Sequence, residues 1–259
     1  MKFTYNISQL VPYINWVYYF YAWQVKDEAE KQRMKAEALS ELDELEGRYH
    51  AYALFQLFDA NSDGDDIVLS NAKRISCLRQ QQGKPPYYCL ADFISPVKSQ
   101  LGLFATSVDI GLETDFDHDV YKKMLTQLLA DRLAEAAAEF LHEQVRKEIW
   151  GYAKDERLSI PDMLIERFQG IRPAVGYPSL PDTSLNFVLN DILDMKQIGI
   201  RLTESGAMKP HASVSGMMIS NPKAKYFSIG KIGEDQLRDY ARRRGLPPEV
   251  LRKWLDVGL

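Results

Sequence analysis

The stretch at residues 119–152 constrains the fold more than any other part of the sequence. Its apolar residues recur every three to four positions, and neither glycine nor proline interrupts it before Gly151. This period predicts one long helix. Between Ala134 and Ala138 all residues but one are alanine. The helix therefore has a face of small side chains, against which another part of the protein can pack closely.

Shorter patterns predict further elements around this helix. Helices are expected at 26–58, 159–168, 186–197, 234–244 and 247–255. Strand character is present at 67–69, 87–93, 103–110, 214–218 and 226–229. The aromatic segment 7–23 contains Pro12, which favours a docked segment over one uninterrupted helix. Because the strands alternate with helices of unequal length, without regular βαβ spacing, we predict an α+β fold.

The balance of charge excludes several classes of partner. Charged residues make up 26% of the chain and the formal net charge is -4. This argues against binding through nucleic-acid phosphates, and equally against anionic membrane surfaces. No stretch reaches the roughly 20 apolar residues of a spanning helix, and the N-terminus lacks a long apolar segment. We therefore expect a cytoplasmic protein.

Two patterns that suggest metal binding are incomplete. Residues 59–65 match the opening of a calcium-binding EF-hand loop, with Gly64 at its sixth position, but Ser70 stands where a bidentate glutamate is required. The histidines are scattered without metal-ligand spacing. Cys77 and Cys89 are not part of a CxxC pair. We predict no metal site, and we expect both cysteines to be buried as small apolar residues.

Residues 170–227 include several that suit a small polar ligand. Arg172 carries a planar fork that matches a carboxylate, and Pro173 and Pro178 stiffen the loop that holds it. The small residues at 212–216 allow a ligand to lie directly on backbone amides. Considered alone, an arginine in such a loop is more often a structural hydrogen-bonding group.

Several longer segments follow one another in the order and spacing of a known family. They include PYINW at 12–16, YCLADFISP at 88–96, GIRPAVGYP at 170–178, RLTESGAM at 201–208, PHASVSG at 210–216, KYF at 225–227 and WLDVGL at 254–259. The segment ADRLAEAAAEFLHEQVRKEIWGYAKDE at 130–156 belongs to the same series. Together they resemble the S-adenosylmethionine-binding activation domain of cobalamin-dependent methionine synthase, and the resemblance covers nearly the whole chain.

This resemblance implies an architecture as well as a ligand. The expected fold is a central twisted antiparallel sheet flanked by helices. The whole of 1–259 would form a single domain, with the aromatic segment and first long helix at 1–58. The main S-adenosylmethionine-binding region would lie at 119–259.

The resemblance also assigns roles to particular residues. It implies S-adenosylmethionine binding by Arg172, Glu135, Asn15, Tyr226, Phe227, Ala174, Ser213, Gly216 and Glu166. Arg172 would anchor the ligand's carboxylate, and Glu135 would help to orient the donor, whereas Glu166 can equally be a surface helix glutamate. The residues expected to face the corrin or its carrier are Tyr177, Asp131 and Thr183. No catalytic residue is implied, because the sulfonium already activates the methyl group and the protein only positions it.

Two residues depart from the family pattern. Asn15 stands where the family usually has an aspartate, so a hydrogen bond remains available but a negative charge is lost. Thr183 stands where a histidine near the corrin is usual. We expect weaker attraction for the ligand's cationic groups at the first position and an altered partner contact at the second.

The sequence contains no D-x-H-x-x-G corrin-binding signature, and two cysteines cannot supply a three-thiolate zinc site. The resemblance therefore implies a free-standing activation subunit that acts with a cobalamin-binding methionine synthase core in methionine biosynthesis. It would present S-adenosylmethionine for reductive methylation of cob(II)alamin, with flavodoxin or a similar protein as one-electron donor. In that case the chain is the accessory component of a methyltransferase. Two alternatives are a regulatory protein that binds S-adenosylmethionine without methyl transfer, and a reactivator of another corrinoid methyltransferase.

Overall fold

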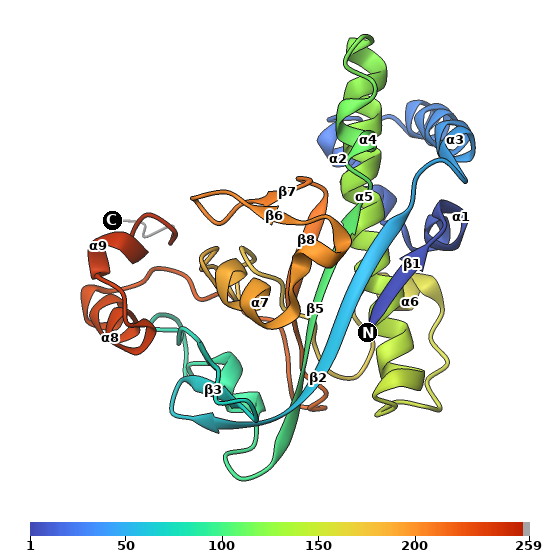
Figure 1. Ribbon diagram of the computed structural model, residues 1–259. Helices are drawn as coiled ribbons and strands as arrows, with labels where there is room; N and C mark the ends of the chain where they lie inside the picture. Colours follow the sequence, from blue (N-terminus) through green and yellow to red (C-terminus); the bar gives the residue numbers. More distant parts are fainter. Residues whose placement is uncertain (256–259) are drawn as a thin grey trace.

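The computed structural model describes residues 1–255, and one antiparallel sheet lies at its centre (Figure 1). Within the described residues this sheet has six strands: β1 (Lys2–Tyr5), β2 (Ala51–Asp63), β3 (Asp66–Leu69), β4 (Arg74–Ser76), β5 (Ser99–Val108) and β8 (Ser213–Met218). β2 and β5 pair from Ala51 opposite Val108 to Ala60 opposite Ser99. β8 extends the sheet beyond β5, while β1 and β3 pair with the other edge of β2 at its two ends.

The remaining elements surround this sheet. The helices are α1 (Ile7–Leu10), α2 (Trp16–Ala22), α3 (Glu28–Leu45), α4 (Gly111–Thr114), α5 (Val120–Gln144), α6 (Ile160–Leu164), α7 (Leu185–Leu193), α8 (Glu234–Arg244) and α9 (Pro248–Leu251). Single turns of tighter or wider helix occur at Val11–Tyr13, Leu90–Phe93, Val145–Ile149 and Met195–Ile198. A separate ribbon pairs β6 (Arg201–Leu202) with β7 (Met208–Lys209).

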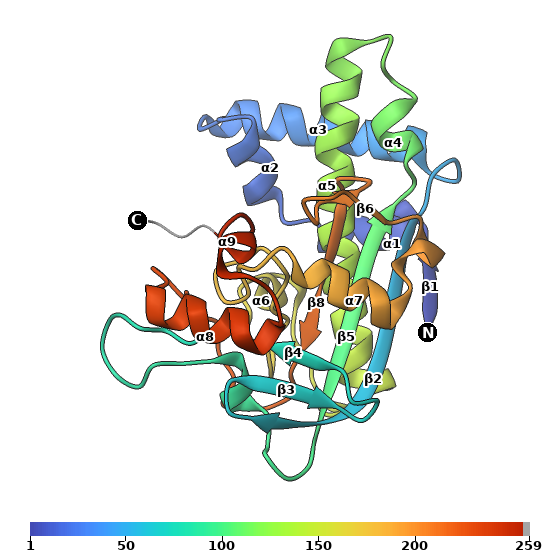
Figure 2. The same ribbon diagram turned by 60° about the vertical axis from the view of Figure 1, so that its left-hand side comes forward.

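The two faces of the sheet are covered by different helices, as Figure 2 shows. Successive strand residues point to opposite faces, so Phe55 and Phe104 pack in the core with α5, whereas Leu54 and Leu103 pack in the core with α7. The alanines of α5 lie fully buried on the sheet. Thr106 of β5 donates a hydrogen bond to a backbone carbonyl of α5, 3.0 Å away. The predicted α+β fold, an antiparallel sheet flanked by helices, is confirmed.

The long helix predicted at 119–152 is present with small changes at its ends. Asp119 caps α5 by accepting a hydrogen bond from the backbone of Lys122. The helix continues beyond Gln144 as a π-helical turn to Ile149. The bounds of α8 are the predicted ones, and Gly245 ends this helix in the left-handed region. α9 stops at Leu251, short of the predicted end.

The helix predicted at 26–58 is wrong in its second half. α3 ends at Leu45, and Gly47, with φ of 73°, turns the chain into β2. In β2 the buried side chains alternate between the two faces, so Ala53 and Phe55 face α5 while Leu54 faces α7. Pairing with β5 along this stretch outweighs the helical spacing of its apolar residues.

Two predicted strands are also wrong. Residues 87–93 form a single bridge at Cys89 and then a 3-10 turn, because the carboxylate of Asp92 accepts the Cys89 amide hydrogen bond and caps that turn. Residues 226–229 run in irregular backbone, where the ring of Phe227 packs against both Tyr88 and Phe93. Similarly, α6 and α7 end earlier than predicted, and Asp194 with φ of 48° ends α7.

The EF-hand-like residues form the end of β2 and the hairpin turn into β3. Two of their three carboxylates are bound by arginines: Asp63 accepts from Arg74 at 2.6 Å, and Asp65 accepts from Arg79 at 2.6 Å. Cys77 and Cys89 are both buried and free, as expected. A hydrogen bond to Cys89, together with burial, raises the pKa of the Cys77 thiol. Among residues 1–255, no helix combines the length and apolarity needed to cross a bilayer.

Candidate functional site

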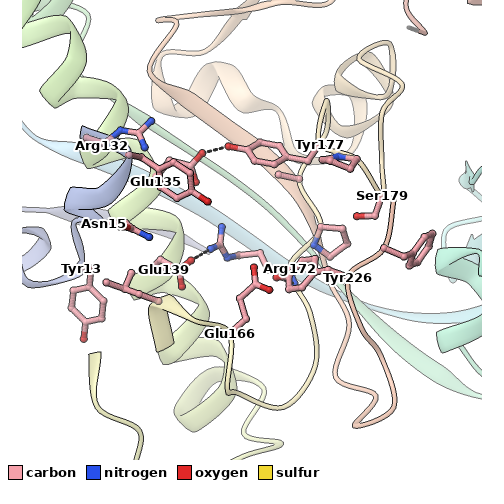
Figure 3. Close-up of a pocket in the computed structure, with 16 residues that line it drawn as sticks. Tyr13, Asn15, Arg132, Glu135, Glu139, Glu166, Arg172, Tyr177, Ser179 and Tyr226 are labelled. Carbon is pink, nitrogen blue, oxygen red and sulfur yellow. Dashed lines mark hydrogen bonds and ion pairs between the residues drawn. The ribbon is translucent and has the colours of Figure 1, made fainter. Parts of the chain in front are cut away.

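A polar stripe on α5 forms one wall of a cavity. Arg132, Glu135 and Glu139 lie three and four positions apart, so their side chains share one face of the helix. The alanines between them are buried against the sheet. Figure 3 shows the three polar side chains directed toward the cavity. The long helix thus contributes both a packing surface and a charged lining.

The opposite wall is an extended segment that runs beside β8. Ile171 exchanges two backbone hydrogen bonds with Ile219, and Ala174 forms a bridge opposite Gly216. A β-carbon at Gly216 would lie 2.2 Å from the carbonyl oxygen of Pro173. Only glycine allows this close approach, which places Arg172 between the sheet edge and α5.

The cavity between these walls has a volume of about 570 Å³. Its lining comes from the α1–α2 region, α5, the end of α6, the loop after Arg172 and the irregular segment near Phe227. The lining residues are Tyr13, Asn15, Tyr18, Arg132, Glu135, Glu139, Leu164, Glu166, Arg172, Pro173, Ala174, Tyr177, Pro178, Ser179, Tyr226 and Phe227. Two guanidiniums and three carboxylates therefore leave this lining with one net negative charge.

Arg172 is the most buried charge in the cavity, with 8% of its surface exposed. Its guanidinium forms an ion pair with Glu139 and lies over the ring of Phe104, 5.8 Å from the centroid. Its backbone amide donates a 2.8 Å hydrogen bond to the hydroxyl of Tyr226. Burial raises the pKa of Tyr226 to about 12, so its hydroxyl stays protonated. Tyr226 thus holds the backbone of Arg172, while Glu139 holds its side chain.

Several buried polar atoms of the cavity lack a hydrogen-bond partner within residues 1–255. They are Nε of Arg172, Nε of Arg132 and Oε2 of Glu139. Buried polar atoms in proteins are nearly always paired, and an orphaned one costs about 1–3 kcal/mol. The three atoms leave both donor and acceptor capacity unused beside the cavity.

The other carboxylates of the cavity differ in their environment. Glu135 accepts a hydrogen bond from the hydroxyl of Tyr177, whose pKa is raised by burial and by this carboxylate. Glu166 lies just after α6 with φ of 61°, in the left-handed region that residues other than glycine rarely adopt. Burial, and next the negative charge of Glu139, raise the pKa of Glu166. A cation in the cavity would relieve this repulsion.

The structure brings most of the predicted site residues together. The predicted residues that line the cavity are Asn15, Glu135, Glu166, Arg172, Ala174, Tyr177, Tyr226 and Phe227. Ser213 does not line the cavity. It lies at the start of β8, where its hydroxyl donates a hydrogen bond to the carbonyl of Pro210. Gly216 lies one layer behind the wall, where it supports Pro173 and Ala174. Its contribution to the site is therefore indirect.

Two residues expected to face the corrin also lie outside the cavity. Asp131 is half-buried on α5, one turn before Glu135, and burial raises its pKa. Thr183 is half-buried, with its hydroxyl 3.5 Å from the carbonyl oxygen of Trp254. Tyr177, half exposed at the cavity, is the one residue of this predicted group that lines it. The WLDVGL motif continues past Leu255, and residues 256–259 lie outside the described part of the chain.

Asn15 has a structural task in addition to its place in the cavity. It is the N-cap of α2, and its Oδ1 accepts a hydrogen bond from the backbone of Val17 at 3.2 Å. The amide nitrogen is therefore the group directed toward the cavity (Figure 3). Because the end of α2 uses the oxygen, the hydrogen bond that remains available to a ligand at this position is one donated by the amide nitrogen.

Sequence reasoning missed five polar or aromatic residues of the lining: Tyr13, Tyr18, Arg132, Glu139 and Ser179. Two of them had a signal in the sequence. Arg132 and Glu139 lie one turn on either side of Glu135 in a helix that was correctly predicted. No comparable signal marks Tyr13 and Tyr18, whose positions depend on how the N-terminal helices dock on α5.

Comparison with known proteins identifies related sequences and structures. Residues 6–245 match the sequence family described as the activation domain of vitamin B12 dependent methionine synthase. The structure is similar to a crystal structure of the MetH reactivation domain bound to AdoHcy, with a TM-score of 0.94. The two sequences are 38% identical, and the match covers 100% of this chain and 90% of that chain. Every element that builds the cavity lies within the matched region.

Proposed function

Because this chain belongs to the activation-domain family of vitamin B12-dependent methionine synthase, we propose that its cavity binds S-adenosylmethionine. The chain then presents the methyl group for reductive methylation of cob(II)alamin carried by a partner synthase core. The observation that carries the proposal is the match between the ligand's charges and the cavity. The ligand has one carboxylate and two cationic groups, and the cavity lining has one net negative charge with unpartnered donors and acceptors.

The dimensions and chemistry of the cavity support this assignment. Its volume of about 570 Å³ falls within the range typical of small-molecule sites. Arg172 supplies the cation for the ligand's carboxylate, and Glu135 orients the donor from the facing helix. The adenine lies at the end formed by Tyr226 and Phe227. Ala174 offers a small surface that allows close approach to the backbone.

The chemical task of the chain is positioning. The sulfonium already activates the methyl group, so no general base is needed. Cobalamin on the partner, with one electron from flavodoxin or a similar donor, supplies the chemistry that accepts the methyl group and leaves S-adenosylhomocysteine. Tyr177, at the exposed side of the cavity, faces the incoming partner. Asp131 and Thr183, which lie outside the cavity, contact the partner protein.

A spectroscopic experiment tests the function. The protein is mixed with a cobalamin-loaded synthase core, a reductant and S-adenosylmethionine, and absorbance follows conversion of cob(II)alamin to methylcobalamin. We expect conversion only when all components are present. If calorimetry detects ligand binding but the spectrum does not change, the proposal that this chain activates that synthase core is wrong. Such a result would favour a regulatory S-adenosylmethionine-binding protein, or a different corrinoid client.

Substituting Asn15→Asp is expected to tighten binding of S-adenosylmethionine by about three- to tenfold. Aspartate is an equally good N-cap, so α2 keeps its first turn while the cavity gains a negative charge near the ligand's cations. Titration calorimetry measures the change. The matched control is Asn6→Asp, at the exposed N-cap of α1 and outside the cavity. Equal affinities for the wild type and Asn15→Asp would show that this position does not sense the ligand's charge.

A further inference from the structure

Two thiols meet in the core, away from the candidate site. Cys77 and Cys89 are both free and fully buried, and they belong to the same apolar cluster. Both reach the backbone carbonyl of Asp65, to which the amide of Cys77 donates at 2.9 Å and the thiol of Cys89 donates at 3.9 Å. A hydrogen bond also joins the two cysteine side chains. The proposed function uses neither of them.

The backbone closes a loop between the two cysteines. Residues 78–88, which we call the cysteine loop, separate them. The two arms of this segment run antiparallel, because Arg79 forms a bridge opposite Cys89 and the amide of Gln80 donates to the carbonyl of Tyr88 at 2.9 Å. A disulfide bond needs a backbone that already holds two cysteines close together. The base of the cysteine loop provides such a backbone.

The cysteine loop supports the last two helices of the described chain. Leu78 packs in the apolar cluster that α8 and α9 form. The side chain of Gln81 accepts a hydrogen bond from the amide of Gly233 at 2.8 Å, and the amide of Arg79 donates to the side chain of Gln236 at 2.6 Å. Figure 2 shows the loop beside α8. Restraining the base of the loop therefore restrains the seat of α8.

We propose that Cys77 and Cys89 are a reversible oxidation site, at which a small disulfide converts the two thiols to one intramolecular disulfide bond that locks the cysteine loop. The thiolate of one cysteine attacks the small disulfide, whose S–S bond breaks, so that a mixed disulfide forms and one small thiol leaves. The other cysteine then displaces the second half of the reagent as a second small thiol. The protein loses two electrons and two protons, and the reagent gains them. This inference does not depend on the proposed function.

Burial makes this oxidation slow. The hydrogen bond to Cys89, together with burial, raises the pKa of the Cys77 thiol, so little of its reactive thiolate forms at neutral pH. Both thiols are covered, so the reagent reaches them only when the cysteine loop opens. We therefore expect oxidation over minutes to hours, the time that uncatalysed disulfide exchange takes.

Locking the cysteine loop has two structural consequences. A cross-link that closes this loop restricts the unfolded chain more than the folded one, so the oxidised protein is more stable than the reduced one. Tyr88, the neighbour of Cys89, packs on the ring of Phe227 with the centroids 5.9 Å apart, and Phe227 lines the cavity. The disulfide bond thus also restrains the support of one cavity wall.

Bis(2-hydroxyethyl) disulfide is the probe that tests the inference. After incubation with it, mass spectrometry of the intact wild type should show the loss of two hydrogen atoms. Because the chain contains only two cysteines, this loss can come from no other pair. Scanning calorimetry should place the thermal midpoint of the oxidised protein about 5 °C or more above that of the reduced protein. A dithiol reductant should restore the original mass and midpoint.

Cys77→Ala and Cys89→Ala are the matched controls, since each leaves one thiol without a partner in the chain. Neither variant should lose two hydrogen atoms or gain stability with the probe. If the wild type kept both thiols, carried two adducts of the probe or formed a disulfide between two chains, the oxidation site would be wrong. An oxidised midpoint no higher than the reduced one would contradict the locking of the loop. None of these measurements uses S-adenosylmethionine, so failure of the proposed function would leave them unchanged.

Discussion

Replacing Arg172 by methionine is expected to weaken S-adenosylmethionine binding by about 30-fold or more. Loss of a charged, bidentate contact with a carboxylate costs roughly 2 kcal/mol or more. Methionine suits this site because Arg172 is almost fully buried beside Phe104. Titration calorimetry with the wild type and the variant measures the effect. An affinity within about twofold of the wild type would mean that Arg172 is not the anchor.

The same substitution should also lower stability, and a double variant separates the two effects. Without Arg172, the buried carboxylate of Glu139 loses its partner, which is unfavourable in a site of low polarity. In Arg172→Met with Glu139→Gln, no unpaired charge remains, so thermal denaturation should recover toward the wild-type midpoint. Ligand binding should stay weak in the double variant. Recovery of binding together with stability would assign Arg172 a purely structural role.

The contrast between Arg172 and Glu139 shows what the sequence could predict of the site. Arg172 lies in a loop of proline and glycine, and the family resemblance predicts that it binds the ligand. Glu139 lies among alanines and charged residues on a long helix, where a glutamate is ordinarily solvent-exposed. Its spacing from Glu135 predicts a shared helix face, but its pairing with Arg172 arises only from the tertiary structure, because the segment beside β8 brings Arg172 against that face of α5.

The same limit applies to the fold. α5 was predicted well because its apolar spacing and its alanine-rich face agree with how it packs on the sheet. β2 was missed because its sequence is apolar on both faces, so its alternation is hidden and a helical spacing fits equally well. Only pairing with β5, which lies some 40 residues later in the chain, decides between strand and helix.

Glu156→Ala is expected to destabilise the protein by about 3–5 kcal/mol, because it leaves the charge of Arg146 buried without a partner. Arg146 is fully buried in the π-helical turn after α5, and its guanidinium bonds to both carboxylate oxygens of Glu156 at 2.7–3.0 Å. The same guanidinium lies over the ring of Phe168, 4.4 Å from the centroid. The pair joins the end of α5 to the segment that leads to Arg172.

Urea denaturation of the wild type and three variants measures this effect. The double variant Arg146→Met with Glu156→Leu should recover most of the lost stability, because apolar side chains of similar volume often replace a buried ion pair without loss. Glu28→Ala breaks the exposed pair with Lys31 and should change stability far less. If Glu156→Ala were no more damaging than Glu28→Ala, the buried pair would contribute little. The junction between α5 and the Arg172 loop would then be held by the apolar packing around Phe168.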